Sequence, residues 1–221
     1  MKNISGLLKI DTMLIAPYWK WLVMFFGIAL LMSIVAGQSG LVFIISFTMF
    51  AGTFTAFNFE NTEKSNLNVL YATLPTNRKS ILFTRYIFIL IVLVLSLIVA
   101  VGVGIIIDLA FGNTLYWEAF ATLACISFAI YLFNTSFQTP FFYRFGYVKG
   151  KIFLWIPLII IMIILNIPVL FDVFNLNVNF NIFEILFRNT TATSLIALAV
   201  GIVSITISYI LSHKIYLKRD F

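Results

Sequence analysis

The stretch Ile81–Ile107, ILFTRYIFILIVLVLSLIVAVGVGIII, contains one charged residue and is long enough to cross a bilayer. A helix needs ~20 apolar residues to span ~30 Å of hydrocarbon. Six apolar runs of this kind divide the chain: Trp19–Ala36, Leu41–Phe57, Ile81–Ile107, Ala119–Phe137, Ile152–Phe171 and Thr191–Ser212. The chain has 62% hydrophobic and 10% charged residues, and a soluble domain of 221 residues would contain fewer hydrophobic and more charged residues. The sequence therefore predicts an all-α polytopic membrane protein with six spanning helices, forming a single domain over residues 1–221.

Basic residues divide the connections between these runs into two classes. Thirteen of the fourteen Lys and Arg residues lie near the N-terminus, near the connections after the second and fourth runs, or in the C-terminal tail; the exception is Arg188. Because short loops rich in Lys and Arg stay in the cytoplasm, we expect both termini to be cytoplasmic. The net charge of +6 is split among short segments next to the membrane, so it indicates contact with lipid headgroups or a cytoplasmic partner rather than nucleic acid.

The N-terminal segment, residues 1–17, has the pattern of a helix lying in the membrane interface. Its apolar residues recur at helical spacing, whereas its polar residues fall on other faces. The apolar set is Ile4, Leu7, Leu8, Leu14 and Ile15, and the polar set is Lys2, Lys9, Asp11 and Thr12. Two interpretations stay open, namely a simple membrane anchor and a contact surface for a partner.

The connection after the second run predicts an amphipathic helix on the cytoplasmic side. Asn61 or Thr62 is suited to cap it, and Glu63 would place negative charge in its first turn. Leu67, Leu70, Tyr71 and Leu74 form one apolar stripe, and Pro75 ends the helix before the third run. Such a stripe is buried either among lipid headgroups or in a groove of a cytoplasmic protein, and physical chemistry alone leaves both open.

The same segment resembles the first cytoplasmic loop of type-2 ABC exporter permeases. The resemblance rests on Glu60 and Glu63, the Leu-rich helix, Leu74-Pro75-x-x-Arg78-Lys79-x-Ile81, and Arg85-Tyr86 at the start of the third run. In that family the loop is a coupling helix that binds a separate ATPase, and the permeases act in pairs. The six-run layout extends the resemblance to the whole chain, and within the family the chain most resembles permeases of staphylococcal exporters of phenol-soluble modulins, which are amphipathic peptide toxins.

What this resemblance implies is a set of partners and a set of contact residues. It implies a cytoplasmic ABC ATPase that binds ATP and Mg²⁺, a second permease copy or paralogue, and a bacterial cell membrane as the location. The implied ATPase contacts are Glu60, Glu63, Leu67, Leu70, Tyr71, Leu74, Pro75, Arg78 and Lys79 in the first loop. The second cytoplasmic loop, Pro140–Lys151, would add Tyr143, Arg144 and Lys149.

The inventory of residues argues against an enzyme. Gly146-x-x-x-Gly150-Lys151 is not a phosphate-binding loop, because its spacing is one residue short and Ile152 replaces the required Ser or Thr. The lone histidine, His213, is expected at a membrane face, so an intramembrane serine protease lacks its base. We therefore expect no cofactor or metal bound directly, and ATP hydrolysis in a partner subunit.

Polar residues within the runs suggest further sites. Asn58, Asn134 and Gln138 lie near the cytoplasmic ends of the second and fourth runs, where they would line a polar vestibule or form hydrogen bonds between helices. Asp108 is expected to be solvated at the outer end of the third run. In the outer loop, residues 172–190, the alternation from Asn175 to Ile182 favours an extended strand.

Two functions of different classes remain. One is the permease subunit of an ATP-driven exporter for amphipathic or hydrophobic cargo. The other is a non-transporting six-span protein, such as the substrate-binding subunit of a vitamin uptake system, an immunity protein or a scaffold. The first run, Trp19–Ala36, has no regular seam of small residues for docking an uptake partner, which favours the exporter.

Overall fold

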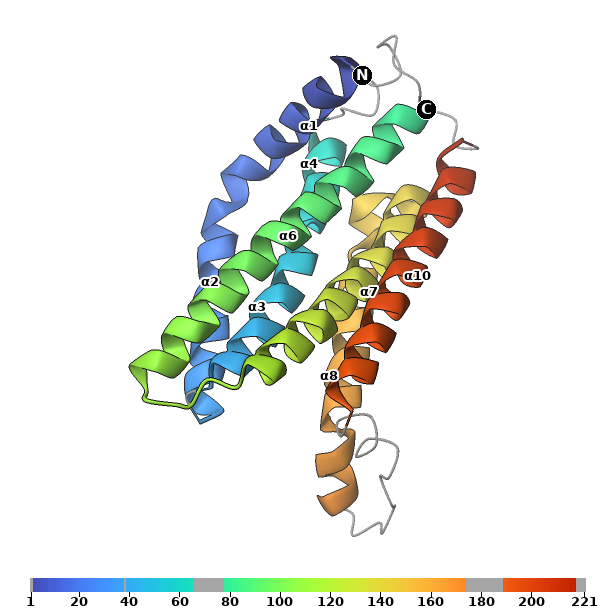
Figure 1. Cartoon of the computed structure of the whole chain (residues 1–221). Coiled ribbons are helices and arrows are strands. Elements are labelled where there is room, and N and C mark those ends of the chain that lie inside the picture. Colours follow the sequence, from blue (N-terminus) through green and yellow to red (C-terminus); the bar gives the residue numbers. More distant parts are fainter. Residues whose placement is uncertain (1, 38, 66–77, 174–188, 218–221) are drawn as a thin grey trace.

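The computed structural model is a bundle of long helices (Figure 1). It describes the chain except for residues 1, 38, 66–77, 174–188 and 218–221. The helices are α1 Lys2–Ile15, the short 3₁₀ helix η1 Ala16–Tyr18, α2 Trp19–Val35, α3 Gly40–Phe54, α4 Ala56–Lys64, α6 Arg78–Ala110, α7 Trp117–Gly150, α8 Ile152–Val173 and α10 Thr190–Leu217. The described residues contain no strand, in agreement with the predicted helical class.

Within the residues that the structure describes, five helical stretches are long and apolar enough to cross a membrane. They are Ser5–Val35, Gly40–Lys64, Lys79–Ala110, Trp117–Gly150 and Thr190–Tyr216. The remaining predicted span, Ile152–Phe171, coincides with α8, of which Ile152–Ile161 is the apolar part searched within the described residues. Helices are the expected outcome, because every backbone polar group in lipid must be hydrogen-bonded within the protein. The chain is thus a multi-pass membrane protein.

Helix α3 occupies the centre of the bundle. It packs against α2, α6 and α7, while α7 lies along both α10 and α8 (Figure 1). The approach of α3 to α6 depends on glycine: a Cβ on Gly40 would stand 2.0 Å from the carbonyl oxygen of Gly104. Small residues at such crossings let two helix backbones touch, which is the usual source of packing energy between helices in lipid.

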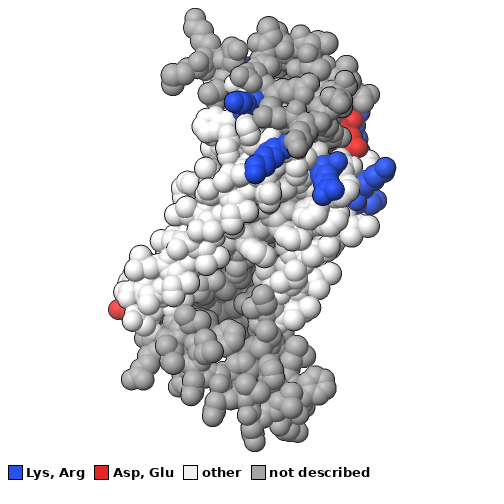
Figure 2. All heavy atoms as spheres, turned by 90° about the vertical axis from the view of Figure 1, so that its right-hand side faces the viewer, with Lys and Arg blue, Asp and Glu red and all other residues white. Residues whose placement is uncertain are grey.

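One end of the bundle gathers positive charge, and we call it the basic end. It is the end where α4, α7 and α10 finish, and their last turns carry Lys64, Lys149 and Lys214. Figure 2 shows the blue Lys and Arg side chains of one face near that end, above a broad uncharged surface. Helix α1 begins and α10 finishes at this same end (Figure 1).

Two predicted boundaries were wrong. The fourth span was expected to end at Phe137, but α7 continues to Gly150 and includes Pro140. Most of the predicted second loop is therefore helical, interrupted only at Gly146. Asn61 and Thr62 do not cap a new helix either, because both lie within α4, whose last residue is Lys64. The predicted helix over 67–74 and the predicted strand from Asn175 to Ile182 lie outside the described residues.

The expectation that Asp108 is solvated was also wrong. Asp108 is only 4% exposed, and its carboxylate accepts hydrogen bonds from the amide of Gly40 at 2.7 Å and from Asn113 Nδ2 at 3.2 Å. Gly40 is the first residue of α3, where backbone N–H groups have no partner within the helix. Asp108 therefore caps the start of α3 from the end of α6.

Candidate functional site

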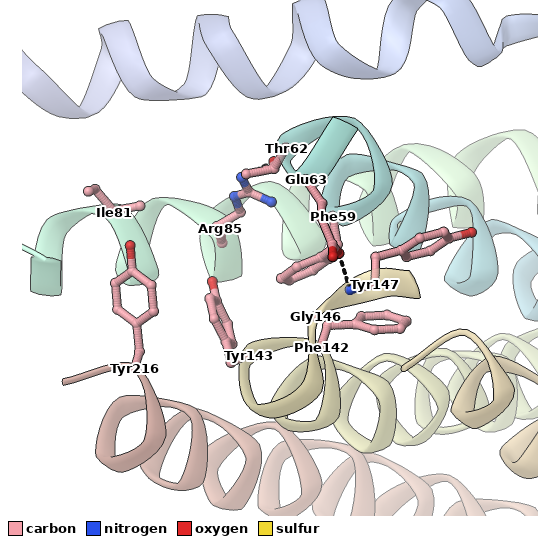
Figure 3. A pocket seen from close by; sticks show the side chains of 10 residues that line it. All are labelled: Phe59, Thr62, Glu63, Ile81, Arg85, Phe142, Tyr143, Gly146, Tyr147 and Tyr216. Atoms are coloured by element: carbon pink, nitrogen blue, oxygen red, sulfur yellow. Dashed lines mark hydrogen bonds between the residues drawn. The ribbon is translucent and has the colours of Figure 1, made fainter. Parts of the chain in front are cut away.

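Five helices meet at the basic end around a cavity of about 30 Å³, which is room for a water molecule or two (Figure 3). Its walls come from α4, α6, α7 and α10, and α1 closes the arrangement through an ion pair. The lining residues are Phe59, Thr62, Glu63, Ile81, Arg85, Phe142, Tyr143, Gly146, Tyr147 and Tyr216. We call this arrangement the basic-end junction.

Arg85 of α6 is the charged centre of the junction. Its Nε lies 3.2 Å from Asp11 Oδ1 on α1, and both side chains are almost fully buried, at 5% and 3% exposure. Its Nη2 donates a hydrogen bond to Thr62 Oγ1 on α4 at 2.6 Å, and its guanidinium lies 5.0 Å from the ring centroid of Phe59. Removing one partner of a buried charge pair is strongly destabilising, because it leaves the other charge without a counter-charge in an apolar interior.

The second element is a helix break in α7 that α4 covers. Gly146 has φ 75° and ψ 171°, a conformation accessible essentially to glycine alone. The helical turn that restarts after it exposes free backbone N–H groups, and Glu63 supplies the acceptor. Its carboxylate accepts from the Tyr147 amide in a short hydrogen bond, shown dashed in Figure 3, and from the Val148 amide at 3.3 Å. Glu63 thus acts as a helix cap contributed by another element.

Aromatic residues connect the junction to α10. The ring of Tyr143 on α7 packs edge-on against Tyr216 of α10, with centroids 5.1 Å apart, and against Phe59 of α4 at 5.3 Å. A second contact joins α6 to α10: Tyr86 Oη of α6 lies 2.8 Å from Ser208 Oγ and 2.9 Å from Ser212 Oγ of α10. The junction therefore joins α1, α4, α6, α7 and α10 into one packed unit.

The junction holds both ends of the segment that the sequence singled out. Residues 66–77 lie between α4, which ends at Lys64, and α6, which begins at Arg78. Glu63 and Thr62, in the last turn of α4, and Arg85, two turns into α6, are all bound within the junction. Thr62, Glu63 and Arg85 therefore connect the two flanks of this segment to α1 and α7.

The structure separates the implied ATPase contacts into three groups. Leu67, Leu70, Tyr71, Leu74 and Pro75 lie outside the described residues, and Arg78 is the first residue of α6. Lys79, Arg144 and Lys149 are exposed at the basic end. Tyr143 is 7% exposed, Glu63 is bound to α7, and Glu60 pairs with Lys64 at 2.6 Å within α4.

The three polar residues considered for a vestibule are all buried. Asn58, Asn134 and Gln138 are exposed by 1% or less. Asn134 accepts a short hydrogen bond from Gln138 and donates to the carbonyl of Met49 on α3 at 3.4 Å. Gly52 leaves room for this contact, because a Cβ there would stand 3.0 Å from Asn134 Nδ2. None of the three lines the described cavities.

Sequence reasoning missed Asp11 and Gly146. Asp11 was placed on a polar face of the N-terminal helix, but it is 2% exposed and lies on the same side as Leu7 and Ile15, four residues to either side. The available signal was Arg85, since a charge inside an apolar run calls for a buried partner. For Gly146, the sequence pattern suggested only a comparison with phosphate-binding loops, which its spacing does not match.

Comparison with known proteins gives one match. Residues 6–217 match the family model described as ABC-2 family transporter protein. No curated protein and no solved structure matches the chain. Within the described residues, no cluster of three or more His, Cys, Asp and Glu side chains could hold a metal ion.

Proposed function

Since the chain belongs to the ABC-2 family of transporter membrane proteins, we propose that it is the permease subunit of an ATP-driven exporter. The observation that carries this proposal is the family match over residues 6–217, which includes the segment 66–77 and the whole basic-end junction. Membership of the family implies a separate ABC ATPase as partner. ATP and Mg²⁺ are bound by that partner.

The permease contributes the conformational change that moves the cargo, and the ATPase drives this change. The stripe of Leu67, Leu70, Tyr71 and Leu74 forms a coupling helix that seats in a groove of the ATPase at the cytoplasmic face, where the basic end lies. Movement of the ATPase displaces this helix, and the basic-end junction passes the displacement to α6 and α7. ATP binding thereby shifts the permease between inward-open and closed arrangements.

The chemical class of the cargo is inferred from the side chains that the spanning helices expose. Two copies, or this chain and a paralogue, face each other and form the path between them. The spanning helices present mostly Phe, Ile, Leu and Val to their surroundings. Such surfaces favour amphipathic or hydrophobic cargo over ions, and amphipathic peptide toxins of the phenol-soluble modulin class are the first substrates to test.

Co-purification of the tagged chain with the ABC ATPase encoded beside it tests the coupling helix. We expect wild-type chain to retain the ATPase, and Leu70→Asp and Arg78→Glu to lose it while still inserting into the membrane. Val69→Asp is the matched control, because residue 69 falls opposite the apolar stripe of the expected helix. Retention of the ATPase by Leu70→Asp, or its loss in Val69→Asp alone, would contradict the proposed contact.

Cysteine labelling tests the orientation. In a Cys125→Ser background, a single cysteine replaces either Tyr116, before α7, or Lys149, near its end; both positions are exposed. A membrane-impermeant maleimide should label the Tyr116→Cys chain in intact cells, and the Lys149→Cys chain only after permeabilisation. The reverse pattern would place the basic end outside and exclude a cytoplasmic partner there.

A further inference from the structure

A groove of about 460 Å³ lies between residues of α7 and α10. Phe133, Phe137 and Phe141 line it on α7, and Ile207, Leu211 and Ile215 line it on α10. Its free volume is far larger than that of the cavity in the basic-end junction. The lining residues extend over several turns of both helices, so the groove is elongated. The two helices themselves run side by side (Figure 1).

The groove has the depth of one membrane leaflet. Its lining extends from Phe133 to Arg144 on α7 and from Ser204 to Ile215 on α10. At 1.5 Å per residue each stretch covers ~16 Å. The hydrocarbon core of a bilayer is ~30 Å thick, so a single leaflet accounts for ~15 Å.

One end of the groove carries positive charge. Arg144 lines the groove at the end nearest the basic end of the bundle, and its side chain is exposed. Lys214, also exposed, lies one helical turn beyond Leu211 of the opposite wall. The other described lining residues are apolar or uncharged, so charge enters the groove at this end alone.

Arg144 stands at headgroup depth. Trp117, which is 65% exposed at the start of α7, has the character of a residue anchored at a membrane–water interface. Arg144 lies ~40 Å from it along the helix at 1.5 Å per residue. A bilayer measures ~40–45 Å with its headgroup regions included, which puts Arg144 among the headgroups of the opposite leaflet.

We propose that this groove is a binding site for one anionic phospholipid of the leaflet at the basic end. One acyl chain lies along the Phe-lined wall between α7 and α10, and the phosphate binds the Arg144 guanidinium, with Lys214 contributing the second positive charge. Arg144 is suited to this role because its planar fork pairs with two phosphate oxygens at once. The bound lipid would hold α10 against α7, the two helices that carry Tyr143 and Tyr216 of the basic-end junction.

Arg144 is also among the ATPase contacts that the family resemblance implies, but lipid binding in this groove requires neither an ATPase nor transport. The full-length chain can therefore be purified without any ATPase and titrated with phosphatidylglycerol and with phosphatidylcholine of the same acyl chains. Native mass spectrometry counts the bound lipids and reports the oligomeric state in the same spectrum.

The charge is tested by Arg144→Gln, with Lys149→Gln as the control. Lys149 is another exposed cation of the basic end, but it does not line the groove. We expect Arg144→Gln to weaken phosphatidylglycerol binding about fivefold, the usual effect of one cation at a membrane surface, and to leave phosphatidylcholine unchanged. Arg144→Lys should restore most of the affinity, and Lys149→Gln should have no effect. Equal losses in Arg144→Gln and Lys149→Gln would show general attraction to the surface and overturn the site.

The groove itself is tested by Leu211→Trp, with Ile210→Trp as the control. The two residues are neighbours on α10 with similar exposure, 47% and 49%, but only Leu211 lines the groove. Filling the groove should remove one bound phosphatidylglycerol, whereas Ile210→Trp should retain it. An unchanged lipid count in Leu211→Trp would refute the proposal. So would a change in oligomeric state without lipid loss, because the groove would then be an interface between copies.

Discussion

Replacing Gly146 by Ala should destabilise the protein by about 1.5–5 kcal/mol, through two separate effects. The backbone at φ 75° and ψ 171° lies in a region that costs a residue with a side chain ~1–3 kcal/mol. The new Cβ would also stand 3.0 Å from the Glu63 carboxylate and force it away from the Tyr147 amide. Loss of a helix cap costs a further ~0.5–2 kcal/mol.

Thermal unfolding of the purified chain in detergent, followed by circular dichroism, measures this loss. At ~2–4 °C per kcal/mol for a chain of this size, the midpoint should fall by roughly 3–20 °C. Gly112→Ala is the matched control. Gly112 also has a positive φ, of 73°, but a Cβ there meets nothing within 4 Å. The control should therefore show the backbone effect without the loss of the cap.

A double substitution isolates the contact with Glu63. Once Gly146→Ala has displaced the carboxylate, Glu63→Ala should add little, so the two substitutions together should cost clearly less than the sum of the single ones. If Gly146→Ala and Gly112→Ala lowered the midpoint equally, or if Gly146→Ala and Glu63→Ala were additive, Glu63 would not cap the restarted helix and the reasoning would be refuted.

Three other substitutions follow from the described contacts. Replacing Arg85 by Met should lower the free energy of unfolding by ~3–5 kcal/mol, because the Asp11 carboxylate stays buried without its counter-charge. The double change Arg85→Met with Asp11→Leu should recover much of this loss in the same melting assay. No recovery would argue against the ion pair. Asp108→Ala should lower the free energy of unfolding by ~1–3 kcal/mol, because it leaves the Gly40 amide without its acceptor. Backbone amides at the start of α3 should then exchange hydrogen faster. Unchanged exchange would contradict the cap. Gly40→Ala should abolish accumulation of folded protein, since its Cβ would overlap a carbonyl oxygen of α6, whereas Gly102→Ala meets open space and should accumulate normally.

The sequence could predict that the chain is built of long apolar helices, because that prediction depends on local composition; within the described residues, five of the six expected spans are long and apolar enough to cross a membrane. An apolar run of sufficient length is driven into lipid, and there the backbone has no alternative to a helix or a closed barrel. The gathering of basic residues at one end could be predicted for the same reason, since each run reverses the direction of the chain. Helix ends were harder: α7 continues past Phe137 because the packing of α10 and α4 against it supports residues that hydropathy alone assigned to a loop.

The partners of the polar residues were decided by tertiary structure alone. Asp11 meets Arg85, Glu63 meets the Tyr147 amide, and Asp108 meets the Gly40 amide, each across a wide separation in sequence. Local periodicity reports on which side of a helix a residue lies, but not which charge faces it from another helix. In an apolar interior, those pairings help to determine which arrangement of the helices has the lowest free energy. Composition therefore determined that the chain spans a membrane, whereas the packing of distant residues determined the basic-end junction.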